Sequence, residues 1–195
     1  MKNKILTTLA VIGFAVAAQA TPVSWDFQQY GVGSLGVGTK TFTSTSGGVL
    51  ITAYASAGDT LYAKNNGAGE VGLGLVGLPN NEITPGHFIQ FGLPTTPATS
   101  LVMTFLQSIQ ANESATLWFS TVLGTLGAQV GTLNGDGSFD FSAYSTGYIG
   151  VSAGAGDVLV GTIAADLRTP DGGSTMLLMG GALTALGLIR RKLTA

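Results

Sequence analysis

Short runs rich in β-branched and aromatic residues fill the chain between residues 21 and 169. Gly, Asn, Asp, Ser and Pro separate the runs at the spacing typical of sandwiches and barrels. No convincing helical period occurs here, so the sequence predicts an all-β fold in which two antiparallel sheets pack as a single β-sandwich domain. The predicted strands cover residues 23–27, 40–45, 49–56, 60–64, 71–75, 87–93, 100–107, 115–122, 138–141, 148–153 and 158–166.

Two tight turns sharpen the prediction for the second half of the chain. Residues 134–137 read Asn-Gly-Asp-Gly between strand-like runs at 130–133 and 139–141, and residues 154–157 read Gly-Ala-Gly-Asp. Glycine after Asn or Asp accepts the positive φ that tight hairpins need. We therefore expect a meander of hairpins in this half. The polar run 39–45 is expected to be an edge strand.

Residues 1–20 have the order of parts found in a secretory signal peptide. Lys2 and Lys4 supply the positive charge, residues 5–18 form the apolar core, and Ala18 and Ala20 are the small residues that signal peptidase requires. Cleavage after Ala20 would start the mature chain at residue 21. A permanent N-terminal anchor is the alternative, for which the apolar core is short.

Residues 170–195 combine an accessible turn, an apolar segment and a basic tip. Pro170 and the glycines that follow it favour the turn. Residues 172–189 carry no charge and are apolar on every side, so as a helix they would reach roughly 27 Å, close to the hydrocarbon thickness of a bilayer. The sequence therefore predicts a transmembrane helix at about 172–189. The basic tip, which would hold its end in the cytoplasm, consists of Arg190, Arg191 and Lys192.

The turn motif decides between a permanent anchor and a processed tail. Its residues are Pro170, Asp171, Gly172, Gly173, Ser174 and Thr175. Followed by the apolar stretch and the Arg-rich end, this run resembles the PEP-CTERM sorting signal of Gram-negative bacteria, in a PDGGST variant. Asp171 and Gly172 replace the Glu-Pro of the commonest form, and Thr169 stands where related tails often carry Val. The resemblance makes 170–195 the sorting signal.

The resemblance also implies partners and a route. Such tails are recognised by exosortase, an integral-membrane cysteine protease or transpeptidase, in bacteria that make exopolysaccharide. The chain would then pass from an inner-membrane intermediate to the cell surface or the extracellular matrix. Residues 61–67, 72–75, 81–83 and 88–91, with the Trp-Asp-Phe start at 25–27, resemble the ectodomains of uncharacterised PEP-CTERM proteins. That second resemblance implies a jelly-roll-like sandwich for 21–169, with no assigned ligand.

The charge balance of residues 21–169 excludes several function classes. Five of the eight basic residues of the chain lie in the two terminal segments. The predicted domain keeps three basic residues against nine acidic ones, a net charge of −6. Nucleic acid and anionic membrane surfaces are therefore poor partners. The chain has no cysteine, which excludes disulfides, thiol nucleophiles and cysteine-ligated zinc.

Motifs that would carry catalysis are weak. Residues 31–36 match the spacing of the dinucleotide fingerprint, but no helix is expected after them, so a loop is favoured. His87 is the only histidine, and no G-x-S-x-G elbow marks a nucleophile. A surface or strand-end role for His87 is favoured over a catalytic triad or a zinc site.

Carboxylates give two candidate cation sites. Asn134, Asp136, Ser138 and Asp140 alternate like the start of a calcium loop, but Ser145 occupies the twelfth position where the closing acid belongs. A plain hairpin is favoured there. The loop 80–82 lies near Glu70 in sequence, and Asp26 or Asp166 is its candidate partner across the sheets. We assign no metal and no cofactor, and a structural calcium ion stays an alternative without assigned ligands.

The sequence favours a non-enzymatic cell-surface or matrix protein associated with exopolysaccharide or biofilm, because no constellation supplies a nucleophile, a base and an orienter. Its expected partners are signal peptidase, an exosortase-type enzyme and exopolysaccharide. The alternative is a secreted carbohydrate-binding module or a glycan-active hydrolase. A hydrolase needs an exposed carboxylate pair about 5 to 10 Å apart. A lectin needs a flat exposed aromatic strip, but most aromatics are expected in the core; the candidates are Trp25, Tyr30, Tyr54, Tyr62, Trp118, Tyr144 and Tyr148.

Overall fold

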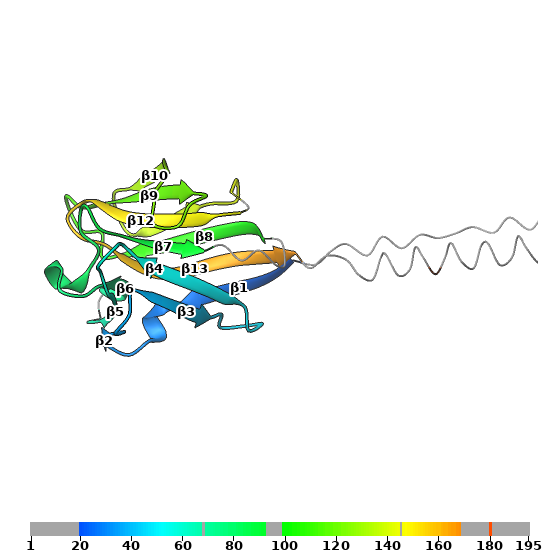
Figure 1. The fold of residues 1–195 in the computed structure, drawn as a ribbon, viewed down its shortest axis with the longest axis horizontal. Coiled ribbons are helices and arrows are strands. Elements are labelled where there is room, and N and C mark those ends of the chain that lie inside the picture. Colours follow the sequence, from blue (N-terminus) through cyan, green and yellow to red (C-terminus); the bar gives the residue numbers. More distant parts are fainter. Residues whose placement is uncertain (1–19, 68, 93–98, 145, 169–179, 181–195) are drawn as a thin grey trace, which may run out of the picture. The chain divides into compact units, whose positions relative to one another are not determined.

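The computed structural model describes residues 20–67, 69–92, 99–144, 146–168 and Gly180. The residues described between 20 and 168 form two antiparallel β-sheets and two short 3₁₀ turns, with no α-helix (Figure 1). This confirms the predicted all-β sandwich. The predicted signal peptide and C-terminal helix lie outside the described residues, apart from Ala20 and Gly180. Among the described residues, no helix has the length and apolar character needed to cross a membrane.

One sheet of the described domain has seven strands. Six follow one another in the order β11-β8-β13-β6-β5-β2, and β1 pairs separately with β13. Their bounds are β1 Ala20–Asp26, β2 Gly33–Ser34, β5 Leu61–Asn65, β6 Val71–Leu75, β8 Thr99–Gln107, β11 Gly137–Asp140 and β13 Leu159–Arg168. We call this sheet A.

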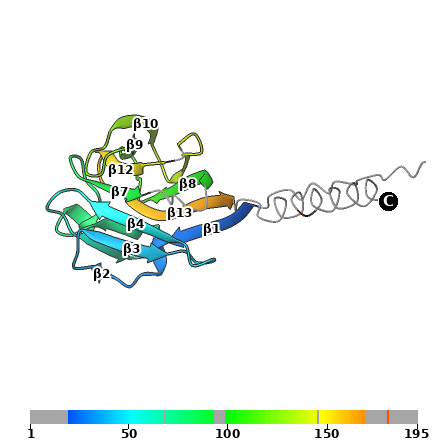
Figure 2. The same ribbon diagram turned by 45° about the vertical axis from the view of Figure 1, so that its right-hand side comes forward.

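The other described sheet, sheet B, has six strands in the order β10-β9-β12-β7-β4-β3 (Figures 1 and 2). Their bounds are β3 Thr39–Thr43, β4 Leu50–Ala55, β7 Phe88–Gly92, β9 Ser114–Ser120, β10 Ala128–Leu133 and β12 Tyr148–Ala155. The two 3₁₀ turns are η1, Phe27–Gln29, and η2, Pro79–Asn81. Each predicted run contains a strand, and β3 lies at a sheet edge as expected. The two-residue β2 was not predicted.

Strand β13 brings the two ends of the domain together. Strand β1 runs antiparallel to it, from the pair Ala20 and Arg168 to the pair Asp26 and Thr162. Asp26 then ends β1, because its Oδ1 accepts a 2.9 Å hydrogen bond from the backbone N–H of Gln28 and caps η1. The N-terminal and C-terminal ends of this domain are therefore neighbouring strand ends.

The predicted meander of hairpins is wrong. The turn at 134–137 joins β10 of sheet B to β11 of sheet A, and the turn at 154–157 joins β12 of sheet B to β13 of sheet A. Turn chemistry reverses the chain, but it does not decide which sheet receives the next strand. Packing decides it here: the ring of Phe139 in β11 covers Gly131 of β10, where any side chain would collide with it.

The space between the sheets is filled by apolar side chains from both. Trp25, Phe27, Phe42, Phe91 and Phe141 are among the largest fully buried residues. The ring of Phe27, just after β1, lies 4.9 Å from that of Phe42 in β3 and 5.4 Å from that of Phe91 in β7. Burying each such side chain contributes about 1.5–3 kcal/mol. These contacts fix sheet A against sheet B.

Replacing Gly74 of β6 by Ala tests how closely the segment 79–82 packs on sheet A. An added Cβ would collide with the carbonyl oxygen of Asn81 and lie 3.0 Å from the Cα of Glu82. Because the backbone must shift, we expect the free energy of unfolding, measured by urea denaturation of the full chain, to fall by about 1–3 kcal/mol. Gly135→Ala is the matched control, since its Cβ would meet no atom within 4 Å. Equal losses in the two variants would contradict this packing.

Candidate functional site

A buried ion-pair network lies on the outer side of sheet A. Lys64 of β5 is 3% exposed, and its Nζ donates to Oε1 of Glu82, which is 1% exposed and follows η2. The same Nζ lies 3.0 Å from a carboxylate oxygen of Glu70, in the turn between β5 and β6. Gly74 of β6 leaves room for the backbone of Asn81 and Glu82, so the segment 79–82 reaches the sheet. One ammonium group thus connects two carboxylates.

Glu82 is the most buried member of this network. Its Oε1 also accepts a 3.1 Å hydrogen bond from the hydroxyl of Ser108, at the end of β8. Its Oε2 is buried and has no hydrogen-bond partner among the described residues. Burial raises the pKa of Glu82, although the hydrogen bonds from Lys64 and Ser108 act in the opposite direction. The network therefore holds the Glu82 carboxylate in place, although burial disfavours its ionised form.

The pKa values of Lys64 and Glu70 change in the directions expected of an ion pair. Burial alone would lower the pKa of Lys64, but its hydrogen bonds to Glu82 and Glu70 outweigh this and raise it. The hydrogen bond from Lys64 lowers the pKa of the Glu70 carboxyl. Near neutral pH, Lys64 is therefore charged and Glu70 is ionised.

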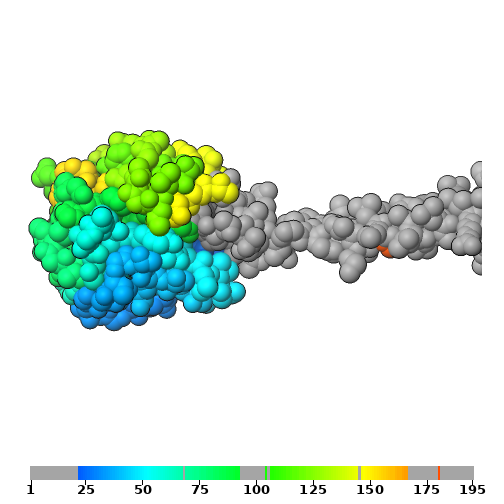
Figure 3. Space-filling view, in the orientation of Figure 1, coloured from blue at the N-terminus to red at the C-terminus, as the bar shows by residue number. Residues whose placement is uncertain are grey.

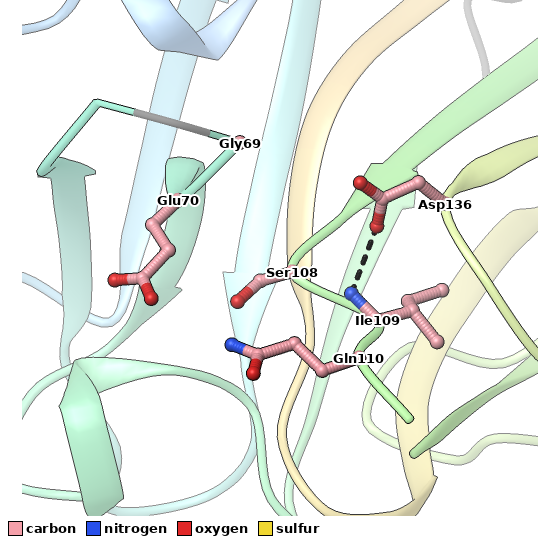
Figure 4. Close-up of a pocket in the computed structure, with 6 residues that line it drawn as sticks. All are labelled: Gly69, Glu70, Ser108, Ile109, Gln110 and Asp136. Carbon is pink, nitrogen blue, oxygen red and sulfur yellow. Dashed lines mark hydrogen bonds between the residues drawn. The ribbon is translucent and has the colours of Figure 1, made fainter. Parts of the chain in front are cut away.

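A small polar cleft of about 120 Å³ lies beside this network. Glu70 and Asp136 stand on opposite sides, with Ser108 and Gln110 between them (Figure 4). Asp136 Oδ1 accepts a 2.8 Å hydrogen bond from the backbone N–H of Ile109, and Gly69 completes the lining. The cleft therefore brings together acids from the first and second halves of the domain.

The chemistry available in this cleft is limited. A glycoside hydrolase needs an accessible carboxyl group of raised pKa opposite a second carboxylate. Glu82 has the raised pKa but is 1% exposed and bonded to Lys64. Glu70 faces the same ammonium group, and Asp136 binds backbone. These acids match a structural network better than a hydrolase pair. Sequence reasoning noted that the loop 80–82 lies near Glu70 along the chain but missed Lys64, for which Gly74 of β6 was the available signal.

His87, just before β7, is arranged differently from a catalytic triad. Its Nδ1 lies 2.8 Å from Oδ2 of Asp59, and the Ser56 hydroxyl donates to the same oxygen. The carboxylate is therefore central, whereas a triad places histidine between serine and acid. The Ser56 hydroxyl also accepts a 3.1 Å hydrogen bond from the N–H of Phe88. This cluster ties the turn after β4 to the start of β7.

The candidate cation ligands make separate hydrogen bonds within the domain. Asp140 accepts a 2.7 Å hydrogen bond from the N–H of Ser142, and Asp136 accepts one from the N–H of Ile109. In the loop 80–82, the Asn80 amide donates to Asp157 at 2.9 Å, and Glu82 joins Lys64 rather than Asp26. Within the residues that the structure describes, no group of three or more His, Asp or Glu side chains could hold a metal ion.

The glycine-rich run 31–36 has no nucleotide-binding geometry. It contains the short strand β2, which pairs with β5, and the next described elements are β3 and β4. A dinucleotide fingerprint needs a helix N-terminus directed at the pyrophosphate, and no helix follows in this described part. Outside the two residues of β2, the run is a loop, as expected.

Three of the seven aromatic candidates are packed within the domain, and four are half-buried on its outer faces. Trp25 is buried and donates from Nε1 to the carbonyl of Val49 at 2.9 Å. Tyr30 packs on Phe42, and Tyr144 stacks on Phe119 at a centroid distance of 4.5 Å. Half-buried aromatics on the outer face of sheet B are Tyr54, Trp118 and Tyr148, and Tyr62 lies on the outer side of sheet A. Sheet B therefore has more of the outward-facing aromatic candidates than sheet A.

Comparison with known proteins bears on the C-terminal segment. Residues 170–193 match the VPDSG-CTERM motif, a relative of PEP-CTERM-type tails. The chain carries a C-terminal sorting motif. This motif points to an exported, surface-directed protein that is sorted by an exosortase-type system. No curated protein and no solved structure matches the chain.

The predicted targeting residues lie at or beyond the limits of the described domain. The motif 170–175 and the basic tip 190–192 are outside the described residues, as is Ala18. Ala20 is the first residue of β1 and pairs with Arg168 of β13. Along the chain, the two predicted targeting segments therefore precede β1 and follow β13, which pair with each other.

Removal of the buried ammonium group should destabilise the domain. In Lys64→Met, the Glu82 carboxylate stays buried without its counter-charge, so we expect the free energy of unfolding in urea to fall by about 3–5 kcal/mol. Lys40→Met, at the edge of sheet B, is the matched control and should change it by about 0.5 kcal/mol or less. The double variant Lys64→Met with Glu82→Leu should recover part of the loss. A similar result for both single variants would refute the buried pair.

Lys64 also predicts a loss of stability at alkaline pH. Its folded pKa lies above the ordinary lysine value of 10.5, so the unfolded chain releases the proton first. The stabilisation is then complete below about pH 10.5 and is lost as pH rises through the folded pKa. Urea denaturation at increasing alkaline pH should therefore show a steeper loss in the wild type than in Lys64→Met. Parallel slopes would contradict the raised pKa.

Proposed function

We propose that this protein is a non-enzymatic component of the cell surface or extracellular matrix, delivered there by processing of its C-terminal tail. The match of residues 170–193 to the VPDSG-CTERM motif is the observation that carries the proposal. In this proposal, signal peptidase removes residues 1–20, and the segment 172–189 then holds the chain in the inner membrane. An exosortase-type protease or transpeptidase acts at the motif 170–175.

The strand pairing of the described domain supports this order of events. Strands β1 and β13 begin and end the sandwich side by side, with Ala20 opposite Arg168. Cleavage after Ala20 would leave residues 21–26 of β1 paired with β13, because their partners 162–167 stay in place. The domain can therefore fold before the tail is processed, and its attachment point lies at one end of sheet A.

The proposal of a non-enzymatic role rests on how the acidic and nucleophilic groups are used. In the described domain, Glu82 binds Lys64, Asp59 binds His87, and Asp136 caps a backbone N–H. No group of these residues combines a nucleophile, a base and an orienter. We further propose that the protein is associated with exopolysaccharide or biofilm, which its exported location would bring within reach.

Deletion of residues 170–175 tests the sorting proposal. The full chain and the deletion variant are expressed in the native host, and intact mass and membrane fractionation are measured for each. We expect the full chain to lose its C-terminal segment and reach the surface fraction, because the enzyme recognises the turn. The deletion variant should keep the mass of the signal-peptide-cleaved precursor and stay in the membrane fraction.

Two controls make this experiment specific. A variant with residues 170–175 in permuted order keeps length and composition and should behave like the deletion. Thr184→Ser, within the apolar segment but outside the motif, should be sorted like the wild type. Unchanged mass and location after deletion would show that the motif does not direct sorting.

A further inference from the structure

The outer face of sheet B is almost free of charge. Its six described strands contain one charged residue, Lys40 of the edge strand β3. Lys40 alternates with the exposed threonines Thr39 and Thr41 and shares the inward-facing parity of buried Phe42. The outward positions carry hydroxyl, amide and aromatic groups, glycine and the exposed side chain of Leu50. In a domain with a net charge of −6 over residues 21–169, such a neutral face is a distinct surface.

Two tyrosines form an aromatic corner on this face. Tyr54 of β4 and Tyr148 of β12 flank the central strand β7, with ring centroids 6.0 Å apart and ring planes at 78°. Gly92 of β7 lies beneath both, since a Cβ there would be 3.7 Å from each ring. Both tyrosines are half-buried. The corner thus offers aromatic rings together with two hydroxyl groups that can donate and accept hydrogen bonds.

The surroundings of the corner are polar and held in place. Thr52 of β4 pairs in register with Gly92, and its hydroxyl is 3.0 Å from that of Thr41 in β3. On the other side, buried Gln90 fixes the loop 121–127 by donating to the carbonyl of Thr125 at 2.8 Å and accepting from the N–H of Gly124 at 2.7 Å. In Figure 3, the segment around β3–β4 (blue to cyan) lies in the lower part of the visible face and the segment around β9–β10 (yellow-green) in the upper part. The corner therefore has fixed neighbours on both sides.

We propose that this corner, formed by Tyr54, Tyr148, Gly92 and Thr52, binds a chain of neutral polysaccharide. The C–H face of a sugar ring packs against an aromatic ring, and its hydroxyl groups exchange hydrogen bonds with tyrosine and threonine hydroxyls. A 78° corner lets one ring stack on the sugar while the other contacts its edge. The outward positions of the described strands of sheet B carry no basic side chain and the domain is acidic, so polysaccharides that carry carboxylates are disfavoured.

The proposal deepens the proposed function, because it rests on an exported location where the domain meets polysaccharide. The binding itself does not require the tail. This separation decides the design of the test, since the deletion of residues 170–175 should abolish sorting and leave binding intact.

Affinity electrophoresis of the purified full chain tests the proposal. Native gels contain mixed-linkage β-glucan, galactomannan or alginate, the last as the acidic probe. We expect retardation by at least one neutral polysaccharide and none by alginate. Tyr54→Ala and Tyr148→Ala should each weaken the retardation about tenfold or more, which corresponds to about 1.4 kcal/mol. Tyr148→Phe, which keeps the ring, should retain most of it.

Two further variants separate binding from folding. Tyr62→Ala removes a half-buried tyrosine from the outer side of sheet A and is the matched control, which should bind like the wild type. Gly92→Leu keeps both tyrosines but fills the corner, and it should lose binding. Urea denaturation of each variant confirms that the compared proteins are folded.

Several results would overturn the proposal. These are the absence of retardation in both neutral gels, stronger retardation in alginate, and equal retardation of wild type and Gly92→Leu. Concentration-dependent dimerisation that Tyr148→Ala abolishes would assign the face to a second copy of the chain instead. A wild-type protein that is sorted normally but binds neither neutral polysaccharide would refute this inference alone. Normal binding together with unchanged mass and location after deletion of residues 170–175 would refute the sorting proposal alone.

Discussion

The pairing of β13 with three other strands holds sheet A together. Along one side it pairs with β8, and along the other it pairs first with β6 at Val160 and then with β1 from Thr162 to Arg168. Because β1 and β6 share one edge of the same strand, the chain must leave that edge at Asp26, where η1 begins. Phe27 then enters the core between the sheets. The start of the chain, the core and the C-terminal strand therefore depend on one another.

The ion-pair network of Lys64, Glu70 and Glu82 serves a different purpose from the core. A buried ion pair adds little net stability, since desolvation offsets much of the attraction between the charges. Its geometric effect is clearer: Glu82 anchors the segment after η2 to β5, while Ser108 anchors the end of β8 to the same carboxylate. Breaking the network would leave Glu82 buried without compensation. The charges thus specify where these segments attach.

The two outer faces of the sandwich differ in chemistry. Sheet A carries the ionic network and the acidic cleft, whereas sheet B presents threonines, glycines and the Tyr54–Tyr148 corner. This division gives the domain one face suited to holding its own loops and another suited to a neutral ligand. It also fits a protein fixed through its C-terminal end, because the tail continues from β13 of sheet A.

The sequence by itself determined the all-β class, most strand positions and the sorting motif, because these depend on local alternation, turn residues and a fixed order of short segments. It did not determine the pairing. The turns at 134–137 and 154–157 reverse the chain equally well within a sheet or between sheets, and contacts such as Phe139 on Gly131 decide between them. For the same reason, the Lys64 network and the tyrosine corner were hidden. Apart from the neighbouring Lys64 and Glu70, their members are far apart in sequence, and only tertiary packing brings them within hydrogen-bonding or ring-contact distance.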